Sequence, residues 1–137
     1  MAKNGTILTN SYATHRCTPS RAGLLTGRYP FRYGLASDPL DIYSPTGLDP
    51  KEKLLPEFFK AGGYSTHMIG KWHLGFCKNS YKPTYRGFDT SFGAYGGQID
   101  YFDHTVTYLG NIFSSLLRIK ISIVCQKFVI FNLGWFV

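Results

Sequence analysis

The chain has 137 residues, of which 44% are hydrophobic and 17% aromatic, so it can bury a core and forms one domain or part of one. Its net charge of +7 would suit a polyanionic partner, but the basic residues are scattered along the chain. Cys17, Cys77 and Cys125 lie far apart, which excludes a clustered zinc site and implies no disulfide framework. No apolar run is long enough for a membrane span, so none is predicted.

The first predicted helix runs from Pro19 to Thr26, with Thr18 as its N-cap. Gly27 suits the left-handed residue that ends a helix. Cys17 therefore lies at a helix N-terminus, where free N–H groups and the dipole favour an anion. Arg21 follows one turn later and can return toward the same point. This arrangement predicts a cradle for a sulfate or phosphate group.

The sequence around Cys17 allows other interpretations. The simplest makes Cys17 a small buried hydrophobe and Arg21 a solvated helix charge. A cysteine-dependent phosphatase needs its arginine six residues after the cysteine, where Gly23 stands. The sequence context of a papain-type protease is absent.

A second helix is predicted after an ordered loop over residues 29–48. Residues 49–52 have capping-box spacing, and Pro56 can restart the helix as a first residue. Gly62 and Gly63 end it. Its apolar face is expected to comprise Leu54, Leu55, Phe58 and Phe59.

A strand is predicted from Tyr64 to Ile69, and Lys71 and His73 follow its carboxyl end, where ligands gather in open α/β sheets. Lys71 offers a point charge for an anionic oxygen, and His73 a proton donor or acceptor. The alternatives are a surface lysine and a loop histidine. A phosphate-binding P-loop is excluded, because Trp72 replaces its Ser/Thr and the upstream glycine is missing. His67 is interpreted as a strand residue that faces its neighbours.

These two segments resemble the two signatures of the sulfatase family, in the family's order. The first is the stretch from Cys17 to Arg28, with cysteine, proline and arginine at positions 17, 19 and 21, and the second is the stretch from Gly63 to Gly75. Residues 86–93 and 100–104 are similar to the arylsulfatase B branch. The resemblance implies an α/β fold, as part of an alkaline-phosphatase-like sulfatase domain with a mixed sheet flanked by helices. It also implies a sulfuric ester hydrolase.

The resemblance further assigns chemical roles. A formylglycine-generating enzyme is expected to read Pro19 and Arg21 and to oxidise Cys17 to formylglycine, whose hydrate is the nucleophile. Lys71 and Arg21 are expected to bind the sulfate group and to stabilise its charge. His73 is expected to hydrogen-bond to the hydrate. The substrate implied is a sulfated sugar or an aryl sulfate ester.

Calcium is the cofactor that the resemblance implies, and it needs six to eight oxygen ligands. Of that shell only Cys17, as formylglycine, matches a residue here, because residues 1–16 contain no Asp or Glu. The chain is therefore expected to be inactive as it stands. We expect residues 1–104 to be a sulfatase N-terminal fragment and residues 105–137 to be an unrelated apolar tail.

Location and modification follow from the same resemblance. Family members are lysosomal or secreted, yet residues 1–5 show no apolar signal-peptide core, so no signal peptide is predicted. Asn4 opens a glycosylation sequon.

Two further functions compete with the hydrolase. One is a non-catalytic remnant that binds sulfated ligands through basic residues. The other is a nucleic-acid-binding domain, because Arg86-Gly87-Phe88 opens like a ribonucleoprotein motif. Asp89 and Thr90 break that motif, so packing is the expected use of the surrounding aromatic rings and no nucleic-acid partner is predicted.

Overall fold

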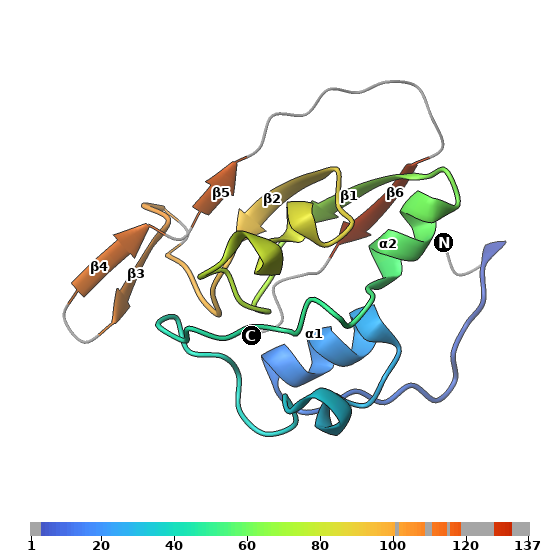
Figure 1. Cartoon of the computed structure of the whole chain (residues 1–137), viewed down its shortest axis with the longest axis horizontal. Helices are drawn as coiled ribbons and strands as arrows, with labels where there is room; N and C mark the ends of the chain where they lie inside the picture. The colour runs from blue at the N-terminus through green and yellow to red at the C-terminus, as the bar shows by residue number, and fades with distance from the viewer. Residues whose placement is uncertain (1–3, 101, 109–110, 115, 119–127, 133–137) are drawn as a thin grey trace.

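The computed structural model describes residues 4–100, 102–108, 111–114, 116–118 and 128–132. Its α-helices are α1 (Cys17–Thr26) and α2 (Leu55–Ala61), and short 3-10 helices cover Pro30–Tyr33, Asn79–Tyr81 and Pro83–Tyr85. The strands are β1 (Ser65–Ile69), β2 (Thr90–Ala94), β3 (Thr105–Tyr108), β4 (Asn111–Ser114), β5 (Leu116–Arg118) and β6 (Phe128–Asn132). Figure 1 shows how these elements are arranged.

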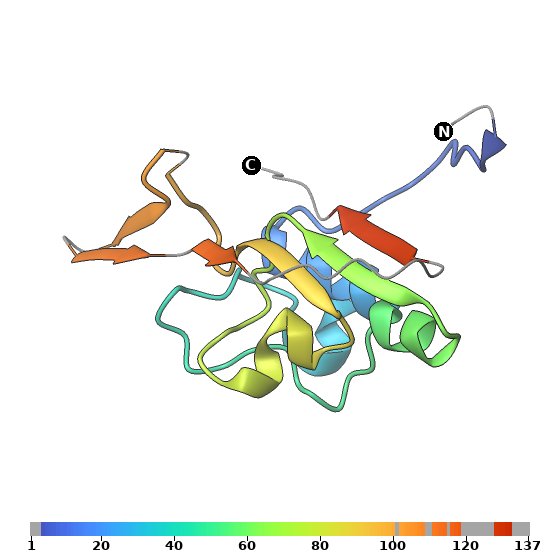
Figure 2. The ribbon, with the colours of Figure 1, turned by 90° about the horizontal axis from the view of Figure 1, so that it is seen from above.

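The main sheet has the strand order β5-β2-β1-β6. β1 runs parallel to β2 and to β6, whereas β5 pairs antiparallel with β2. β3 and β4 form a separate antiparallel hairpin that projects away from the helices in both ribbon views (Figures 1 and 2). A mixed sheet with helices packed against it confirms the predicted α/β class.

Helix α1 begins two residues earlier than predicted. Arg16 is extended and stands as the N-cap without a side-chain hydrogen bond to the helix, so the prediction of Thr18 as N-cap is wrong. Thr18 is instead a fully buried residue of the first turn. Gly27 ends the helix with φ of 66° and donates its N–H to Gly23, as predicted.

Helix α2 starts at a different cap from the one predicted. Residues 49–52 form a turn, and Glu57 reaches back to accept the Leu54 N–H at 2.8 Å. Leu55 and Phe58 are 38% and 55% exposed, so the predicted apolar face is wrong for these two residues. The local pattern identified the helix, but contacts with β1 and α1 decide which side is buried.

The segment after β1 continues beside the end of β2. Gly70, Trp72 and His73 donate their N–H groups to carbonyls of residues 92, 94 and 95. The backbones approach so closely that a Cβ at Gly93 would lie 1.8 Å from the Gly70 carbonyl oxygen, and Gly93 has φ of 146°. Only glycine fits there. This close pairing fixes where the side chains of residues 71–73 emerge.

The core lies between α1 and the sheet, around Trp72, which is fully buried and meets Phe88 edge to face with ring centroids 6.1 Å apart. The Trp72 indole N–H donates to the carbonyls of Gly75 and Tyr81. The other members of the core are Ala22, Leu25, Leu48, Leu54, Met68 and Leu74. A signature residue of the second segment is thus the centre of the core, which anchors its neighbours Lys71 and His73.

Residues beyond 104 contribute β3 to β6, and two of these strands, β5 and β6, belong to the main sheet. The division at residue 104 stays a prediction. Among the described helices, none has the length and apolar character needed to cross a membrane.

Candidate active site

Cys17 and Lys71 meet at the edge where β1 ends. Cys17 is the first residue of α1 and is partly buried, and the Lys71 ammonium donates to its Sγ at 3.1 Å. Lys71 is only 3% exposed. The two signature segments, 54 residues apart, are thus brought together as the sequence predicted.

Arg21 lies on the buried face of α1 and is 6% exposed. Its Nη1 donates to the Lys71 carbonyl, so it ties the helix to the segment after β1. Burial lowers the pKa of Arg21, while the neighbouring Cys17 raises it. An arginine nevertheless stays charged in proteins. Arg21 therefore keeps a second positive charge beside Cys17.

His73 is held with one ring nitrogen bonded and the other without a partner among the described residues. Nε2 lies 2.8 Å from the Leu40 carbonyl oxygen, which can only accept, so Nε2 carries the proton. Nδ1 is buried and makes no hydrogen bond. Burial lowers the pKa of His73 to about 4, with Lys71 and Arg21 acting in the same direction against the Leu40 bond. At neutral pH the imidazole is therefore uncharged, with a free lone pair on Nδ1.

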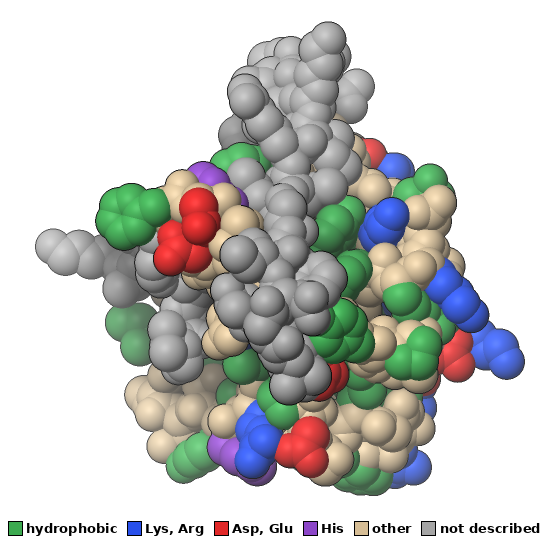
Figure 3. All heavy atoms as spheres, turned by 90° about the vertical axis from the view of Figure 1, so that its left-hand side faces the viewer, with side chains coloured by type: hydrophobic (Ala, Val, Ile, Leu, Met, Phe, Trp, Pro, Cys, Tyr) green, Lys and Arg blue, Asp and Glu red, His purple; other side chains and the backbone are tan. Residues whose placement is uncertain are grey.

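The electrostatics of this site favour an anion. Lys71 takes part in none of the ion pairs found in the described part of the chain, which join Arg16 to Asp38, Arg28 to Glu52 and Lys60 to Asp89. On the face drawn in Figure 3, basic side chains are interspersed with acidic and neutral ones. A buried ammonium without a carboxylate is costly unless an anion joins it.

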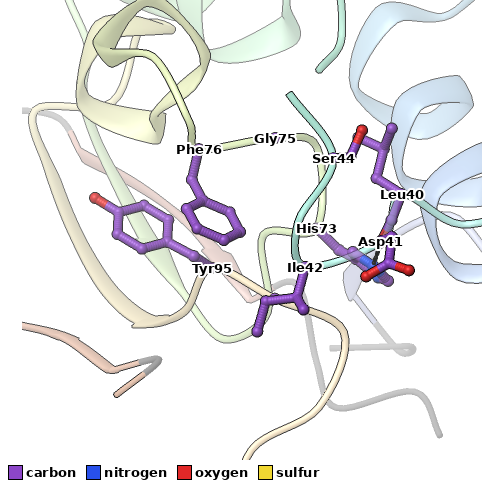
Figure 4. Close-up of a pocket in the computed structure, with 9 residues that line it drawn as sticks. Leu40, Asp41, Ile42, Ser44, His73, Gly75, Phe76 and Tyr95 are labelled. Atoms are coloured by element: carbon purple, nitrogen blue, oxygen red, sulfur yellow. Dashed lines mark hydrogen bonds between the residues drawn. The ribbon is translucent and has the colours of Figure 1, made fainter. Parts of the chain in front are cut away.

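A small cavity borders His73. It measures about 10 Å³, which is room for about one water molecule. Figure 4 shows His73 beside Leu40 on one side, and Phe76 beside Tyr95 on the other. The two aromatic rings are stacked with centroids 5.5 Å apart. Asp41, Ile42, Ser44, Gly75 and Gly96 complete the lining.

Calcium is the ion that the family resemblance implies, with Cys17 as its one expected ligand in this chain. No three His, Cys, Asp or Glu side chains in that part of the chain lie close enough together to hold a metal ion. The side chain that contacts Cys17 is the Lys71 ammonium, whose charge opposes a dication. These residues by themselves therefore fit an anion and not calcium.

The remaining predicted residues have ordinary environments. Asn4 is exposed, which a glycosylation site requires, though its use stays a prediction. His67 Nδ1 pairs with the Thr90 hydroxyl of β2 at 2.7 Å, as its interpretation as a strand residue implied. Arg86 and Phe88 of the ribonucleoprotein-like segment are buried.

Sequence reasoning missed two contributors to the site. The Thr18 hydroxyl donates to the His73 carbonyl, and the Leu40 carbonyl accepts from the His73 ring. A hydroxyl on the buried face of α1 was the available signal for Thr18. Leu40 acts through its backbone, so its side-chain type carried no signal.

Comparisons with known proteins point to one family. The sulfatase family model matches residues 1–116. Mouse arylsulfatase J is 44% identical over 104 residues, covering 76% of this chain and 17% of that protein. Human N-acetylgalactosamine-6-sulfatase is 40% identical over 102 residues, covering 69% of this chain and 19% of that protein. The chain thus spans about a fifth of the length of these relatives.

The chain is also similar to a solved structure. The crystal structure of Ps i-CgsB superimposes with a TM-score of 0.60 and 37% identity, covering 64% of this chain and 19% of that one. A second structure of that protein, in complex with k-i-k-neocarrahexaose, has a TM-score of 0.60 and 36% identity. The described residues form part of an alkaline-phosphatase-like fold. With the family model matched over most of its length, the chain belongs to the sulfatase family.

Proposed function

We propose that this chain carries the nucleophile end of a sulfuric ester hydrolase site, with Cys17 as the precursor of formylglycine. The observation that supports this most is the 3.1 Å contact between the Lys71 ammonium and Cys17 Sγ at the N-terminus of α1. Lys71, Arg21 and the helix dipole all favour negative charge at that point.

The proposed reaction starts from the hydrated formylglycine at position 17. One of its hydroxyl oxygens forms a bond to the sulfur of a sulfate ester, and the sulfur–oxygen bond to the alcohol breaks. The alcohol leaves after it takes up a proton. The remaining hydroxyl then loses its proton, the aldehyde re-forms, and sulfate departs with the bridging oxygen. Water rehydrates the aldehyde.

Lys71 and Arg21 stabilise the charge on the transferring group in this proposal. His73 accepts a hydrogen bond from the hydrate through Nδ1, the nitrogen left without a partner among the described residues. Its low pKa keeps that lone pair available down to acidic pH. No step is assigned to calcium, because the described residues do not fit it.

The substrate class proposed is a sulfated sugar or an aryl sulfate ester. Relatives of this chain are named as arylsulfatases and as N-acetylgalactosamine-6-sulfatase, and one structural neighbour was solved with k-i-k-neocarrahexaose. By the same likeness we propose a lysosomal or secreted location, with a glycan at the exposed Asn4.

Modification of Cys17 gives the first test. The chain is expressed behind a secretion signal together with the formylglycine-generating enzyme, and its peptides are weighed by mass spectrometry. The Cys17 peptide is expected to show the mass loss of a thiol converted to an aldehyde. Cys77, which is exposed and lacks the motif, serves as the internal control and stays a thiol. An unmodified Cys17 would refute this part of the proposal.

A chimera gives the second test. Residues 17–104 replace the matching segment of human N-acetylgalactosamine-6-sulfatase, and hydrolysis of N-acetylgalactosamine 6-sulfate is measured. Turnover that disappears in Cys17→Ala is the expected result. A well-folded, formylglycine-bearing chimera without turnover would contradict the assignment of the site.

The isolated chain, even with formylglycine, is expected not to turn over a chromogenic aryl sulfate when calcium is added. Residues 1–37 contain no carboxylate, and the described residues form no metal cluster. Turnover well above the uncatalysed rate that is lost in Cys17→Ala would show that the expected metal ligands are dispensable. The non-catalytic alternative predicts instead that heparin binding depends on Arg21 and Lys71.

A further inference from the structure

Three groups form a closed ring of hydrogen bonds next to Cys17. The Thr18 hydroxyl donates to the His73 carbonyl at 2.9 Å and accepts the Leu40 N–H at 3.0 Å. The Leu40 carbonyl accepts from His73 Nε2 at 2.8 Å. Thr18 is fully buried, so no solvent competes for its hydroxyl. One side chain thus connects the backbone of His73 to the residue that orients the His73 ring.

The backbone of His73 needs such support. Its φ is 57°, in the left-handed region that residues other than glycine seldom adopt. A conformation of this kind persists only where the surroundings over-determine it. The Thr18 bond to the His73 carbonyl and the His73 N–H bond to Tyr95 supply two of those constraints.

The Cε1 edge of the ring is confined by backbone. A Cβ at Gly97 would lie 2.6 Å from His73 Cε1, 3.1 Å from Nε2 and 3.3 Å from Nδ1, so a side chain there would displace the imidazole. The ring therefore has little room to turn away from Leu40. Packing therefore sets part of the ring orientation. The position of the Leu40 carbonyl sets the rest.

We propose that Thr18 is a positioning residue that fixes the tautomer and orientation of the His73 imidazole by holding the Leu40 backbone against it. The hydroxyl places the Leu40 carbonyl so that the proton stays on Nε2 and Nδ1 stays an acceptor. This inference rests on the proposed role of His73. Its test needs neither formylglycine nor turnover, so its failure is distinguishable from failure of the proposed function.

The test uses the full chain, labelled with ¹⁵N, and long-range ¹H–¹⁵N spectra of its histidine rings at pH 7. His73 is identified by the signals lost in His73→Gln. The native chain is expected to show the Nε2–H tautomer. In Thr18→Val, which keeps the shape and removes the hydroxyl, we expect a mixture of tautomers and at least tenfold faster amide exchange at Leu40. Thr18→Ser is expected to restore the native spectrum.

Thr66→Val is the matched control, because Thr66 is equally buried and donates to the Gly87 carbonyl away from His73. It is expected to lower stability and leave the His73 tautomer unchanged. If Thr18→Val does not fold, Thr18→Ala takes its place in the comparison with Thr18→Ser. An Nδ1–H tautomer in the native chain would overturn the proposal without any variant. So would an unchanged tautomer in a folded Thr18→Val, or a Thr18→Ser chain that behaves like Thr18→Val.

Discussion

Two buried arginines show how the same side chain serves two different regions. Arg86 is 2% exposed and donates to the carbonyls of Leu48 and Glu52 at 2.9 and 2.7 Å, with a longer bond to Asp49. Burial lowers the pKa of Arg86, and the carboxylates of Glu57, Asp49 and Glu52 raise it. Arg86 is therefore a cation whose charge its surroundings already balance.

Arg21 is as well buried but lies in the opposite electrostatic setting. Its charge adds to that of Lys71, and both lower the pKa of His73. The Arg86 region is complete without a ligand, whereas the Arg21 region gains from an anion. Burial does not distinguish the two arginines, but the sign of the neighbouring charges does.

The largest effect is expected from Arg86→Met. It leaves buried carbonyls unpaired and carboxylates without their cation, so the free energy of unfolding should fall by about 4 kcal/mol. Urea denaturation measures it. Arg16→Met, which removes an exposed ion pair with Asp38, is the control and should change stability by less than about 1 kcal/mol. Equal losses in the two variants would contradict the structural role of Arg86.

Acid should destabilise the Arg21 region through His73. The pKa of His73 is lowered from 6.5 to about 4 on folding, so between these values the unfolded chain binds a proton that the folded chain does not. The stability is fully present above pH 6.5 and is lost as the pH falls, by about 3 kcal/mol at pH 4. Denaturation midpoints between pH 7 and 4.5 measure this loss.

The His73→Asn variant should show a weaker dependence of stability on pH. Replacing the exposed His15 should leave that dependence unchanged. The lowered pKa of Asp89 removes stability only below its ordinary 3.8, so it acts outside this window. A native-like slope in His73→Asn would show that another group titrates.

Lys71→Met is expected to change the free energy of unfolding by less than Arg86→Met does, and in the opposite direction. Removing a buried ammonium from the neighbourhood of Arg21 should leave stability unchanged or raise it by about 1 kcal/mol when no anion is present. Denaturation in a chloride buffer of low ionic strength checks this. A loss as large as that of Arg86→Met would mean that Lys71 is a structural residue like Arg86, and the contrast between the two regions would disappear.

The sequence predicted most of the local structure and some of the contacts between residues that are far apart in the chain. Pro19, Gly27 and the glycines at 62–63 identified both helices, and the strand before Lys71 was placed within one residue. The meeting of Cys17 with Lys71 followed from the rule on strand ends. Thr18 was given a capping role because capping is the local use of threonine; its actual partners lie 22 and 55 residues away.

The exposed side of α2 and the contribution of Leu40 were beyond sequence reasoning for a related reason. Phe58 faces outward because contacts with β1 and α1, and not the apolar pattern of the helix itself, decide which side of α2 is buried. Leu40 makes its hydrogen bonds to Thr18 and His73 through its backbone N–H and carbonyl, so its side-chain type carried no signal for them.

Sulfate binding tests the central claim, an anion site built on Cys17, Lys71, Arg21 and His73, most directly. Sodium sulfate is titrated into the ¹⁵N-labelled chain at constant ionic strength, and the amide signals at the start of α1 are followed. We predict saturable shifts centred on residues 17–21, weakened about tenfold or more in Lys71→Met. Lys60→Met, which removes an exposed lysine paired with Asp89, should leave them unchanged. Shifts that do not saturate, or that respond equally to both variants, would contradict the account.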